Sequence, residues 1–255
     1  MQGLKGKTII VTGGGGGIGG STCKRLAQEG AKLAVLDRDL GAAQKTAAQI
    51  TEAGGTALAL ACDITQRSEI DAALAQIEAQ LGPVDVLVNN AGWDVFKPFT
   101  QTNEQEWERL IAINLTGALH MHHAVLPRMV ERRAGRIVNI ASDAARGGSS
   151  GEAVYSACKG GLVALSKTLA REHARQNITV NVVCPGPTDT ALLAGVAEGA
   201  RDPAKLLEAF RSAIPLGRLG QPDDLASAIA FFGSDDAGFI TGQVISVSGG
   251  LTMHG

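Results

Sequence analysis

A run of five glycines, Gly13–Gly17, restricts the fold of this chain more than any other feature of its sequence. Thr8–Val11 before the run is apolar and β-branched, as in a strand buried on both faces of a parallel sheet. Residues 21–29 after it resume the spacing of an amphipathic helix. Glycine leaves no Cβ to block a bound group, and a helix N-terminus offers N–H groups to an anion. This context predicts a dinucleotide pyrophosphate site, whereas the glycines alone would also fit a flexible loop.

The length of 255 residues fits one α/β domain covering 1–255, and two domains are a less favoured division. A net charge of −2 without a basic run predicts neither a nucleic-acid nor an anionic-membrane partner. An apolar run of about 20 residues, as a membrane span needs, does not occur. The four cysteines lack metal-ligand spacing, so we expect no metal, reduced thiols and a cytoplasmic protein.

Asp37 stands at the end of a second predicted strand, Lys32–Leu36. An acidic residue about 20 residues after such a glycine turn accepts hydrogen bonds from the adenosine ribose, and its charge repels a 2′-phosphate. Asp37 therefore favours NAD over NADP. Arg38 beside it could instead pair with a 2′-phosphate, and a solvated loop carboxylate is the simpler alternative for Asp37.

The remaining chain alternates apolar segments with helical ones. Further strands are predicted at 56–62, 84–88, 136–140, 178–183 and 243–247, and helices at 41–53, 68–80, 104–133, about 155–175 and 222–232. This alternation predicts an α/β, doubly wound (Rossmann-type) seven-stranded parallel sheet with helices on both faces. Polar or turn residues follow the strands, and we expect them to converge on one crevice: Asp37, Asp63, Asn89, Ser142 and Pro185-Gly186.

Tyr155 and Lys159 carry the strongest chemical signal. Residues at i and i+4 share one helical face, so the phenol and the ammonium can meet at one substrate atom. Tyr155 is the only tyrosine in the chain, and Ser142 precedes it at the end of a strand. A surface helix pair is the alternative, because Tyr-x-x-x-Lys often occurs by chance.

Together, Thr12-Gly13-x-x-x-Gly17-x-Gly19, Asn89-Asn90-Ala91-Gly92 and the Ser142, Tyr155, Lys159 series resemble the short-chain dehydrogenase/reductase family over essentially the whole chain. The resemblance implies NAD-linked chemistry at a CH–OH group and a homotetramer. It implies that Tyr155 exchanges the proton, that Ser142 holds the substrate oxygen and that Lys159 favours the phenolate. Asn114, in a similar N-x-x-G segment, would hold a water of the proton relay; without the resemblance it would be a helix-packing amide.

The same resemblance implies which residues contact the cofactor. Asp63 would contact the adenine, although it could also cap the next helix. The predicted cofactor residues are Gly13, Gly16, Gly17, Ile18, Asp37, Arg38, Cys62, Asp63, Ile64, Asn90, Ala91, Gly92, Tyr155, Lys159, Pro185, Gly186, Thr188 and Thr190.

For the substrate we expect an apolar pocket under a mobile lid at about 188–214. The predicted pocket side chains are Trp93, Val95, Phe96, Leu192, Leu193 and Val196. Arg146 could meet an anionic group or be an exposed loop charge. Segments 114–133, 139–162, 181–193 and 238–250 are similar to those of family members that oxidise a ring hydroxyl β to a CoA thioester.

Two other functions stay open: a 3-oxoacyl-thioester reductase and a catalytically silent dinucleotide-binding regulator. The spacing of His120 and His123 suits one shared metal, but with His122 they are better explained by packing or a subunit contact, because no third ligand is evident nearby.

Overall fold

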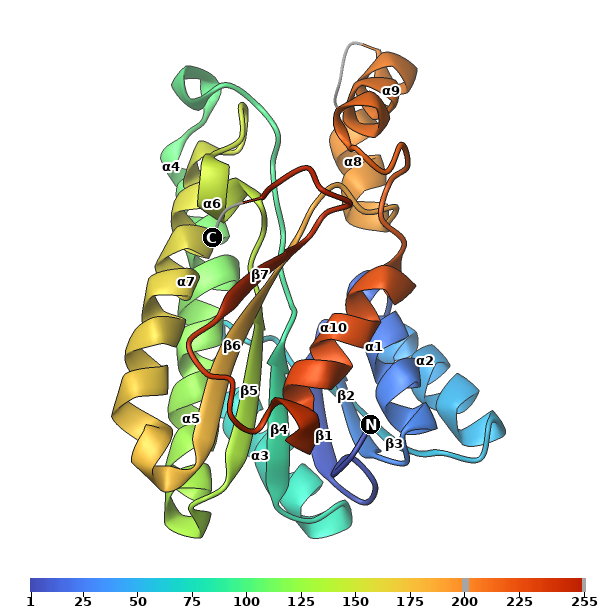
Figure 1. Cartoon of the computed structure of the whole chain (residues 1–255), viewed down its shortest axis with the longest axis vertical. Helices are drawn as coiled ribbons and strands as arrows, with labels where there is room; N and C mark the ends of the chain where they lie inside the picture. Colours follow the sequence, from blue (N-terminus) through green and yellow to red (C-terminus); the bar gives the residue numbers. More distant parts are fainter. Residues whose placement is uncertain (199–201, 254–255) are drawn as a thin grey trace.

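The computed structural model describes residues 1–198 and 202–253 and confirms a seven-stranded parallel sheet with helices on both faces (Figure 1). The strand order is β3-β2-β1-β4-β5-β6-β7, and each neighbouring pair is parallel. The strands are β1 Thr8–Thr12, β2 Lys32–Asp37, β3 Thr56–Ala61, β4 Val84–Asn89, β5 Gly135–Ile140, β6 Ile178–Pro185 and β7 Val244–Val247. The order reverses between β1 and β4, which is where open α/β sheets bind ligands.

Alternate residues of the strands serve two separate cores. In β1, Ile10 packs with one cluster, whereas Ile9 and Val11 pack with the other. Helices α1 (Gly17–Gln28), α2 (Leu40–Glu52) and α10 (Pro222–Gly233) cover one face. Helices α3 (Arg67–Gln80), α5 (Gly117–Arg132) and α7 (Ala153–His173) cover the other. Burial on both faces explains why the strands read as continuous apolar runs.

The helix predicted over 104–133 is divided by a π-helical turn. It consists of α4 (Glu104–Ile111), the turn Ala112–Thr116 and α5. It begins at a capping box between Asn103 and Glu106 and ends at Arg133, whose φ of 52° is left-handed. The π turn places Asn114 inside the fold, and such turns are frequent at functional sites.

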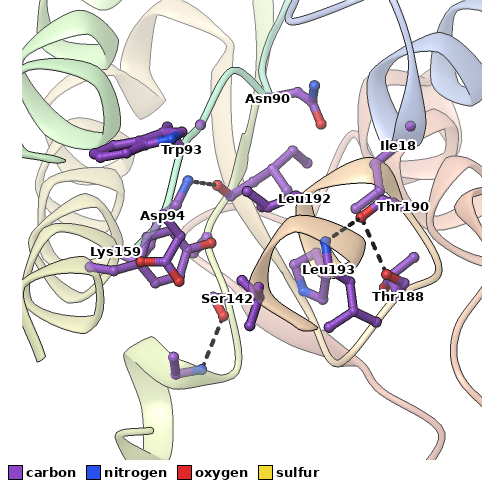
Figure 2. A pocket seen from close by; sticks show the side chains of 18 of the residues that line it. Ile18, Asn90, Trp93, Asp94, Ser142, Lys159, Thr188, Thr190, Leu192 and Leu193 are labelled. Atoms are coloured by element: carbon purple, nitrogen blue, oxygen red, sulfur yellow. Dashed lines mark hydrogen bonds between the residues drawn. The ribbon is translucent and has the colours of Figure 1, made fainter. Parts of the chain in front are cut away.

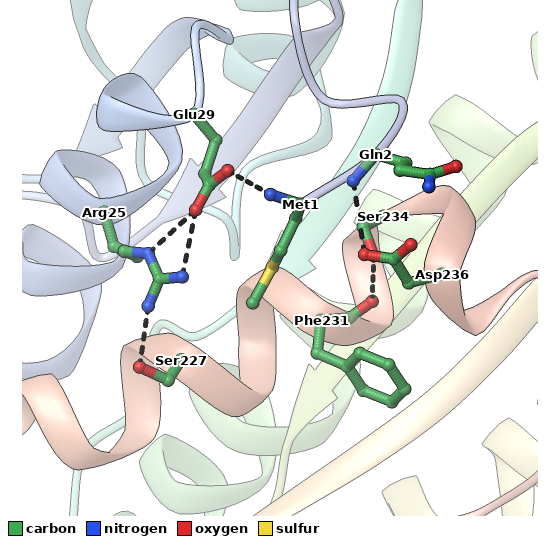
Figure 3. Close-up of polar contacts among 8 residues, drawn as sticks. All are labelled: Met1, Gln2, Arg25, Glu29, Ser227, Phe231, Ser234 and Asp236. Atoms are coloured by element: carbon green, nitrogen blue, oxygen red, sulfur yellow. Dashed lines mark hydrogen bonds and ion pairs between the residues drawn. The ribbon is translucent and has the colours of Figure 1, made fainter.

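Polar contacts join α1 to α10, and the N-terminal residues join the end of α1 to the segment after α10, as Figure 3 shows. Arg25 of α1 binds Glu29 and donates a hydrogen bond to Ser227 Oγ of α10 at 2.8 Å. The Met1 ammonium also binds Glu29, and the Gln2 N–H donates to Asp236. These contacts hold the helix that follows the glycine run against its neighbour.

Two helices, α8 (Ala191–Glu198) and α9 (Pro203–Ala213), stand beyond the carboxyl ends of the strands (Figure 1). They occupy most of the predicted lid, of which residues 199–201 lie outside the described residues. The short helices are η1 Phe99–Gln101, α6 Ala144–Gly147, η3 Ala174–Gln176 and η4 Asp235–Ala237. Within residues 1–198 and 202–253, no helix has both the length and the apolar character needed to span a membrane.

Candidate active site

A cavity of about 890 Å³ lies at the carboxyl edge of the sheet. This volume is in the range typical of small-molecule and cofactor sites. Every residue predicted to contact the cofactor lines it, from Gly13 after β1 to Thr190 before α8. Ser142 lines the same cavity, whereas Asn114 does not. The predicted crevice is therefore present, with residues from distant parts of the chain on its walls. Asn89 is the exception among the predicted strand-end residues, because its side chain is buried between β4 and β5 and does not border the cavity.

The glycine turn is closely packed at Gly19 and open to the cavity at Gly16. A Cβ on Gly19 would lie 2.1 Å from the Gly13 carbonyl oxygen, so a larger residue cannot fit there. A Cβ on Gly16 would meet nothing within 4 Å, and the Gly16 backbone borders the cavity. Helix α1 begins at Gly17 without a side-chain cap and without an acidic residue in its first turn. Its positive end is therefore free to attract an anion, which fits a dinucleotide.

Asp37 is fixed in place by backbone donors rather than freely solvated. Its Oδ2 accepts from the Gly15 N–H at 2.9 Å, and its Oδ1 accepts from the Asp39 N–H at 3.0 Å. Both Asp37 and the exposed Arg38 line the cavity. The structure thus places the acidic and the basic candidate for ribose recognition side by side.

Asp63 does not cap helix α3 with its side chain. Its Oδ1 accepts instead from the Thr65 N–H at 2.9 Å and the Thr65 hydroxyl at 2.8 Å. The helix begins at Arg67, and its N-cap residue, Gln66, makes no side-chain cap bond. The capping alternative is therefore wrong, while the predicted adenine contact stays a prediction.

The Asn89-Asn90-Ala91-Gly92 segment ties neighbouring strands together through its amides. Asn89 Nδ2 donates to Asn139 Oδ1 at 2.9 Å across β4 and β5. Asn90 Nδ2 donates to the carbonyls of Thr12 and Gly13 at 3.0 and 3.1 Å. These bonds fix the cavity wall against the glycine turn.

Ser142, Tyr155 and Lys159 surround the inner end of the cavity. Tyr155 is buried against Leu110 and hydrogen-bonded to Ser142. Lys159 Nζ donates to the Ile140 carbonyl at 2.9 Å and lies 5.6 Å from the centroid of the Tyr155 ring. One helical turn of α7 therefore aims the phenol and the ammonium into the same space, as the i, i+4 spacing predicts.

Burial has the largest effect on the pKa of the Tyr155 phenol. Burial raises this pKa, the charges of Asp94 and Glu152 raise it further, and the Ser142 hydrogen bond lowers it. Burial also lowers the pKa of Lys159 to about 8. Lys159 is not among the groups that shift this pKa, so its predicted effect on the phenolate stays a prediction. Within the chain, desolvation and the two carboxylates favour the neutral phenol.

Asn114 does not border the cavity but hydrogen-bonds to Trp93, which does. Its Oδ1 accepts from the Trp93 N–H at 3.2 Å, and its Nδ2 donates to the carbonyls of Trp93 and Leu110 at 2.7 and 3.0 Å. A Cβ on Gly92 would lie 3.1 Å from Asn114 Oδ1 and 3.4 Å from Lys159 Nζ. Asn114 thus fixes the loop after β4 beside Lys159, and its predicted role toward a water stays a prediction.

The substrate end has one polar wall and one apolar wall. In Figure 2, Trp93, Asp94 and Lys159 lie on one side and Leu192 and Leu193 of α8 on the other, with Ser142 between them. Thr190 Oγ1 contacts the Thr188 carbonyl and the Leu193 N–H, which anchors the start of α8. Among the predicted pocket side chains, Phe96 and Val196 also border the cavity.

Three predictions from sequence need a correction or a qualification. Val95 packs beside the buried Tyr155 cluster and does not border the cavity, because neighbours in an extended loop point in different directions. Arg146 does not border the cavity either, so it cannot contact an anion inside the cavity. Its Nη1 donates a hydrogen bond to Ser246 Oγ at 3.0 Å, so it is also not an exposed loop charge. Each histidine contacts a different partner. His122 contacts the Ala118 carbonyl, His120 the Ile64 carbonyl and His123 the Arg67 side chain.

The cavity also contains ionisable residues that sequence analysis missed. Asp94 follows the Asn-Asn-Ala-Gly segment, and Glu152 immediately precedes α7. Arg109 of α4 stacks over Trp93, with Cζ 3.9 Å from the ring centroid. Asp94 directly follows Trp93 and Glu152 lies three residues before Tyr155, which was the available signal for these two; only the fold brings their segments and Arg109 together. The described residues contain no group of three or more metal-ligating side chains.

Comparison with known proteins defines the class. The sequence model of the family described as "Enoyl-(Acyl carrier protein) reductase" matches residues 13–252. The chain is similar to 2-(S)-hydroxypropyl-CoM dehydrogenase 3 of Xanthobacter autotrophicus, with 38% identity over 98% of each chain. It is also similar to the (2S)-[(R)-hydroxy(phenyl)methyl]succinyl-CoA dehydrogenase subunit BbsD of Thauera aromatica, with 37% identity over 99% of each.

Among solved structures, levodione reductase superposes with a TM-score of 0.93 at 29% identity, covering 96% of this chain and 97% of that one. The fold and the cavity define a nicotinamide-dinucleotide oxidoreductase. The chain belongs to the short-chain dehydrogenase/reductase family, whose members act on CH–OH groups and the corresponding ketones.

Proposed function

We propose that this protein oxidises a secondary alcohol to a ketone with NAD, through Ser142, Tyr155, Lys159 and Asn114. The observation that carries the proposal is the single cavity that contains Ser142, Tyr155 and Lys159 at one end and the glycine turn at the other. Asp37 supports the choice of NAD, because its carboxylate is oriented by two backbone donors at the predicted ribose position.

The chain supplies proton transfer and orientation. When bound, the dinucleotide supplies the carbon that exchanges a hydride with the substrate and, in its oxidised form, a positive charge. In the oxidation Tyr155 takes the proton of the substrate hydroxyl as a general base, which requires its phenolate form, and Ser142 donates a hydrogen bond to the same oxygen. Lys159 and the positive charge of the oxidised dinucleotide would favour the phenolate against the effect of burial. Lys159, held by the Ile140 carbonyl, brings a positive charge to the phenol end of the cavity. Asn114 keeps the Trp93 loop in place and would serve the water of the proton relay.

For the substrate we propose 2-hydroxycyclohexane-1-carboxyl-CoA, oxidised to 2-oxocyclohexane-1-carboxyl-CoA in alicyclic or aromatic acid degradation. Segments 114–133, 139–162, 181–193 and 238–250 resemble those of 2-hydroxycyclohexanecarboxyl-CoA dehydrogenase. Leu192, Leu193 and Val196 offer an apolar wall for the ring. The similarity to the (2S)-[(R)-hydroxy(phenyl)methyl]succinyl-CoA dehydrogenase subunit BbsD supports a CoA thioester as the substrate class.

The lid belongs to the same proposal. Helices α8 and α9 contribute Leu192, Val196 and Phe210 to the cavity, so a substrate must pass or displace them. We propose that the segment at 188–214 closes over bound substrate and that residues 1–255 work as one catalytic domain. Exclusion of water would strengthen the electrostatic effect of Ser142 and Lys159.

The test is oxidation of 2-hydroxycyclohexane-1-carboxyl-CoA by purified protein with NAD, followed by the absorbance of reduced NAD. Oxidation with NAD supports the proposal. If the protein does not oxidise this thioester but reduces acetoacetyl thioesters with NADPH, the 3-oxoacyl-thioester reductase is the better description. If no alcohol or ketone reacts, the silent dinucleotide-binding regulator replaces both.

We further propose a cytoplasmic homotetramer that binds a small molecule rather than nucleic acid or membrane. Its four cysteines are free and buried, which suits a reducing compartment. Ile111 and Leu119 are 43% and 39% exposed on the α4 and α5 helices, and such apolar surface suits a subunit contact. Sedimentation measures the assembly: a monomer would contradict this part of the proposal.

A further inference from the structure

Three polar side chains connect the turn that carries Ser142 to the edge strand β7. Arg146 Nη1, in the short helix α6, donates to Ser246 Oγ of β7 at 3.0 Å. The Ser246 hydroxyl donates in turn to Asp143 Oδ1 at 2.5 Å. Asp143 directly follows Ser142, and β6 separates β5 from β7 in the sheet. This Arg146–Ser246–Asp143 network therefore crosses β6 to reach the serine turn.

The direction of each hydrogen bond in this network is fixed. A guanidinium can only donate and a carboxylate can only accept, so the one proton of the Ser246 hydroxyl points to Asp143. Because a charged group stands at each end, both bonds are stronger than bonds between neutral groups. Asp143 is 8% exposed, so water competes little for its Oδ1. The network therefore holds the Asp143 carboxyl group in one orientation.

Backbone hydrogen bonds shape the same turn around Ser142. The Asp143 N–H donates to the Pro185 carbonyl at 3.0 Å, and the Asp143 carbonyl accepts from the Arg146 N–H at 2.9 Å. Inside this turn, Ser142 Oγ accepts from the Ala144 N–H at 3.2 Å. That bond occupies an acceptor site of the serine and leaves its proton for an oxygen in the cavity. The direction of the Ser142 hydroxyl thus depends on how the turn at Asp143 is held.

Only one end of the network reaches the cavity. Ser142 and Asp143 border the cavity, whereas Ser246 and Arg146 do not. Ser246 therefore cannot touch a substrate or a dinucleotide that fills this space. An effect of the Ser246 hydroxyl on the reaction has to pass through its hydrogen-bond partner, Asp143, which belongs to the serine turn.

We propose that Ser246 is a positioning residue for the reaction: held by Arg146, it fixes Asp143 and thereby aims the Ser142 hydroxyl at the substrate oxygen. The inference rests on the proposed function, because it uses the role that Ser142 has there. A misaligned donor stabilises the transition state less, since hydrogen bonds weaken with distance and angle. Arg146 acts on the reaction through Ser246, although it lies outside the cavity wall.

The test is a double-mutant cycle of Ser246→Ala and Ser142→Ala, with kcat measured for oxidation of 2-hydroxycyclohexane-1-carboxyl-CoA by NAD. Alone, Ser246→Ala should lower kcat by about tenfold, because a small misplacement of a catalytic group is costly. The KM for NAD should change by less than about twofold, since Ser246 does not border the cavity. In the Ser142→Ala background, Ser246→Ala should lower kcat by less than about twofold, because the hydroxyl that it positions is gone.

Two further serine variants match Ser246→Ala. Threonine keeps the hydroxyl and suits a strand, so Ser246→Thr should retain most of the wild-type kcat. Ser227 Oγ also accepts from an arginine, Arg25 Nη1 at 2.8 Å, but it lies on α10 and does not border the cavity. Ser227→Ala should therefore leave kcat unchanged. Arg146→Met should lower kcat as Ser246→Ala does, and likewise only while the Ser142 hydroxyl is present.

A wild-type kcat in Ser246→Ala overturns the inference and leaves the proposed function intact. An equal loss of kcat with and without the Ser142 hydroxyl also overturns it, because the network would then only stabilise the fold. If the protein instead reduces acetoacetyl thioesters, the cycle is measured on that reaction, where Ser142 faces the corresponding oxygen; the expected pattern there supports the inference while the proposed substrate fails. If Ser142→Ala turns over like the wild type, or if no alcohol or ketone reacts, both proposals fail.

Discussion

Asn114 holds both backbone polar groups of Trp93 with one side-chain amide, at 3.2 Å for the N–H and 2.7 Å for the carbonyl. Asn114 is 1% exposed and lies in the π-helical turn between α4 and α5. The turn thus positions the loop that carries Trp93 and Asp94 on the cavity wall. Asn114 is unfavourable inside a helix by propensity, and in the folded protein its amide has a specific partner in Trp93.

Asn114→Leu should destabilise the protein and disturb the cavity together. The substitution removes the side-chain hydrogen bonds to the part-buried N–H and carbonyl of Trp93 and to the carbonyl of Leu110. Each such group costs about 1–3 kcal/mol, so thermal unfolding should move down by several degrees. A calorimetric scan beside kcat measures both effects. Normal stability with a large loss of kcat would instead show that Asn114 acts mainly through the proton relay.

Tyr155→Phe should remove turnover while cofactor binding persists. The variant loses the hydroxyl that exchanges a proton with the substrate, and general acid–base groups contribute about 10²-fold to 10⁴-fold. Its ring keeps the contacts with the buried cluster around Leu110. Initial-rate assays give kcat. Quenching of protein fluorescence by NADH gives the Kd for NADH, which should change by less than about threefold. Turnover at the wild-type rate would defeat the assignment of Tyr155.

The wild-type protein should show a higher kcat/KM with NAD than with NADP. Asp37 is oriented by the Gly15 and Asp39 N–H groups, and its charge repels a 2′-phosphate. Asp37→Ser removes that repulsion, so NADP should gain relative to NAD by about tenfold or more. Initial rates with both cofactors measure the ratio. A wild-type preference for NADP would mean that the neighbouring Arg38 decides the outcome.

Gly19→Ala should lower the thermal midpoint by about 3–10 °C, because its Cβ would lie 2.1 Å from the Gly13 carbonyl oxygen. Backbone on both sides of this contact leaves little room for relaxation. Gly16→Ala is the matched control: its Cβ would meet no atom within 4 Å, and its φ of −177° is open to any residue. Thermal scans of both variants compare them. Equal midpoints would contradict the close packing of the turn.

His122 should make the protein sensitive to acid. Burial lowers the pKa of this imidazole to about 4, below the ordinary value near 6.5. The folded state therefore holds the neutral form, and the unfolded state binds a proton first. Stability is present above about pH 6.5 and falls as pH drops toward 4, by on the order of 3 kcal/mol.

Urea unfolding at pH 7 and pH 4.5 tests this prediction with two variants. In His122→Met, the difference in unfolding free energy between the two pH values should shrink, because the buried titratable group is gone. His123→Met serves as the control, since His123 is exposed on the same helix. An unchanged difference in His122→Met would show that other groups cause the acid sensitivity.

Local sequence was sufficient for the strands, the glycine turn and the placement of Tyr155 and Lys159 on one helical face. The central residues of β1 and β2, Ile9–Val11 and Leu33–Leu36, are all apolar because both faces of the sheet are covered, so their strands could be predicted without a partner. Tyr155 and Lys159 meet because four residues complete about one helical turn. These features depend on neighbours in sequence, and their predictions needed no knowledge of long-range contacts.

The tertiary structure decided which distant segments are in contact and how these contacts change the pKa values of their side chains. Asp94 and Glu152 come from separate segments, and only the fold brings their carboxyl groups together beside Tyr155. The same packing raises the pKa of the phenol and turns Asn114 toward Trp93. Sequence spacing determines which residues share an element, whereas desolvation and charge depend on which elements enclose them, and that is a property of the folded chain alone.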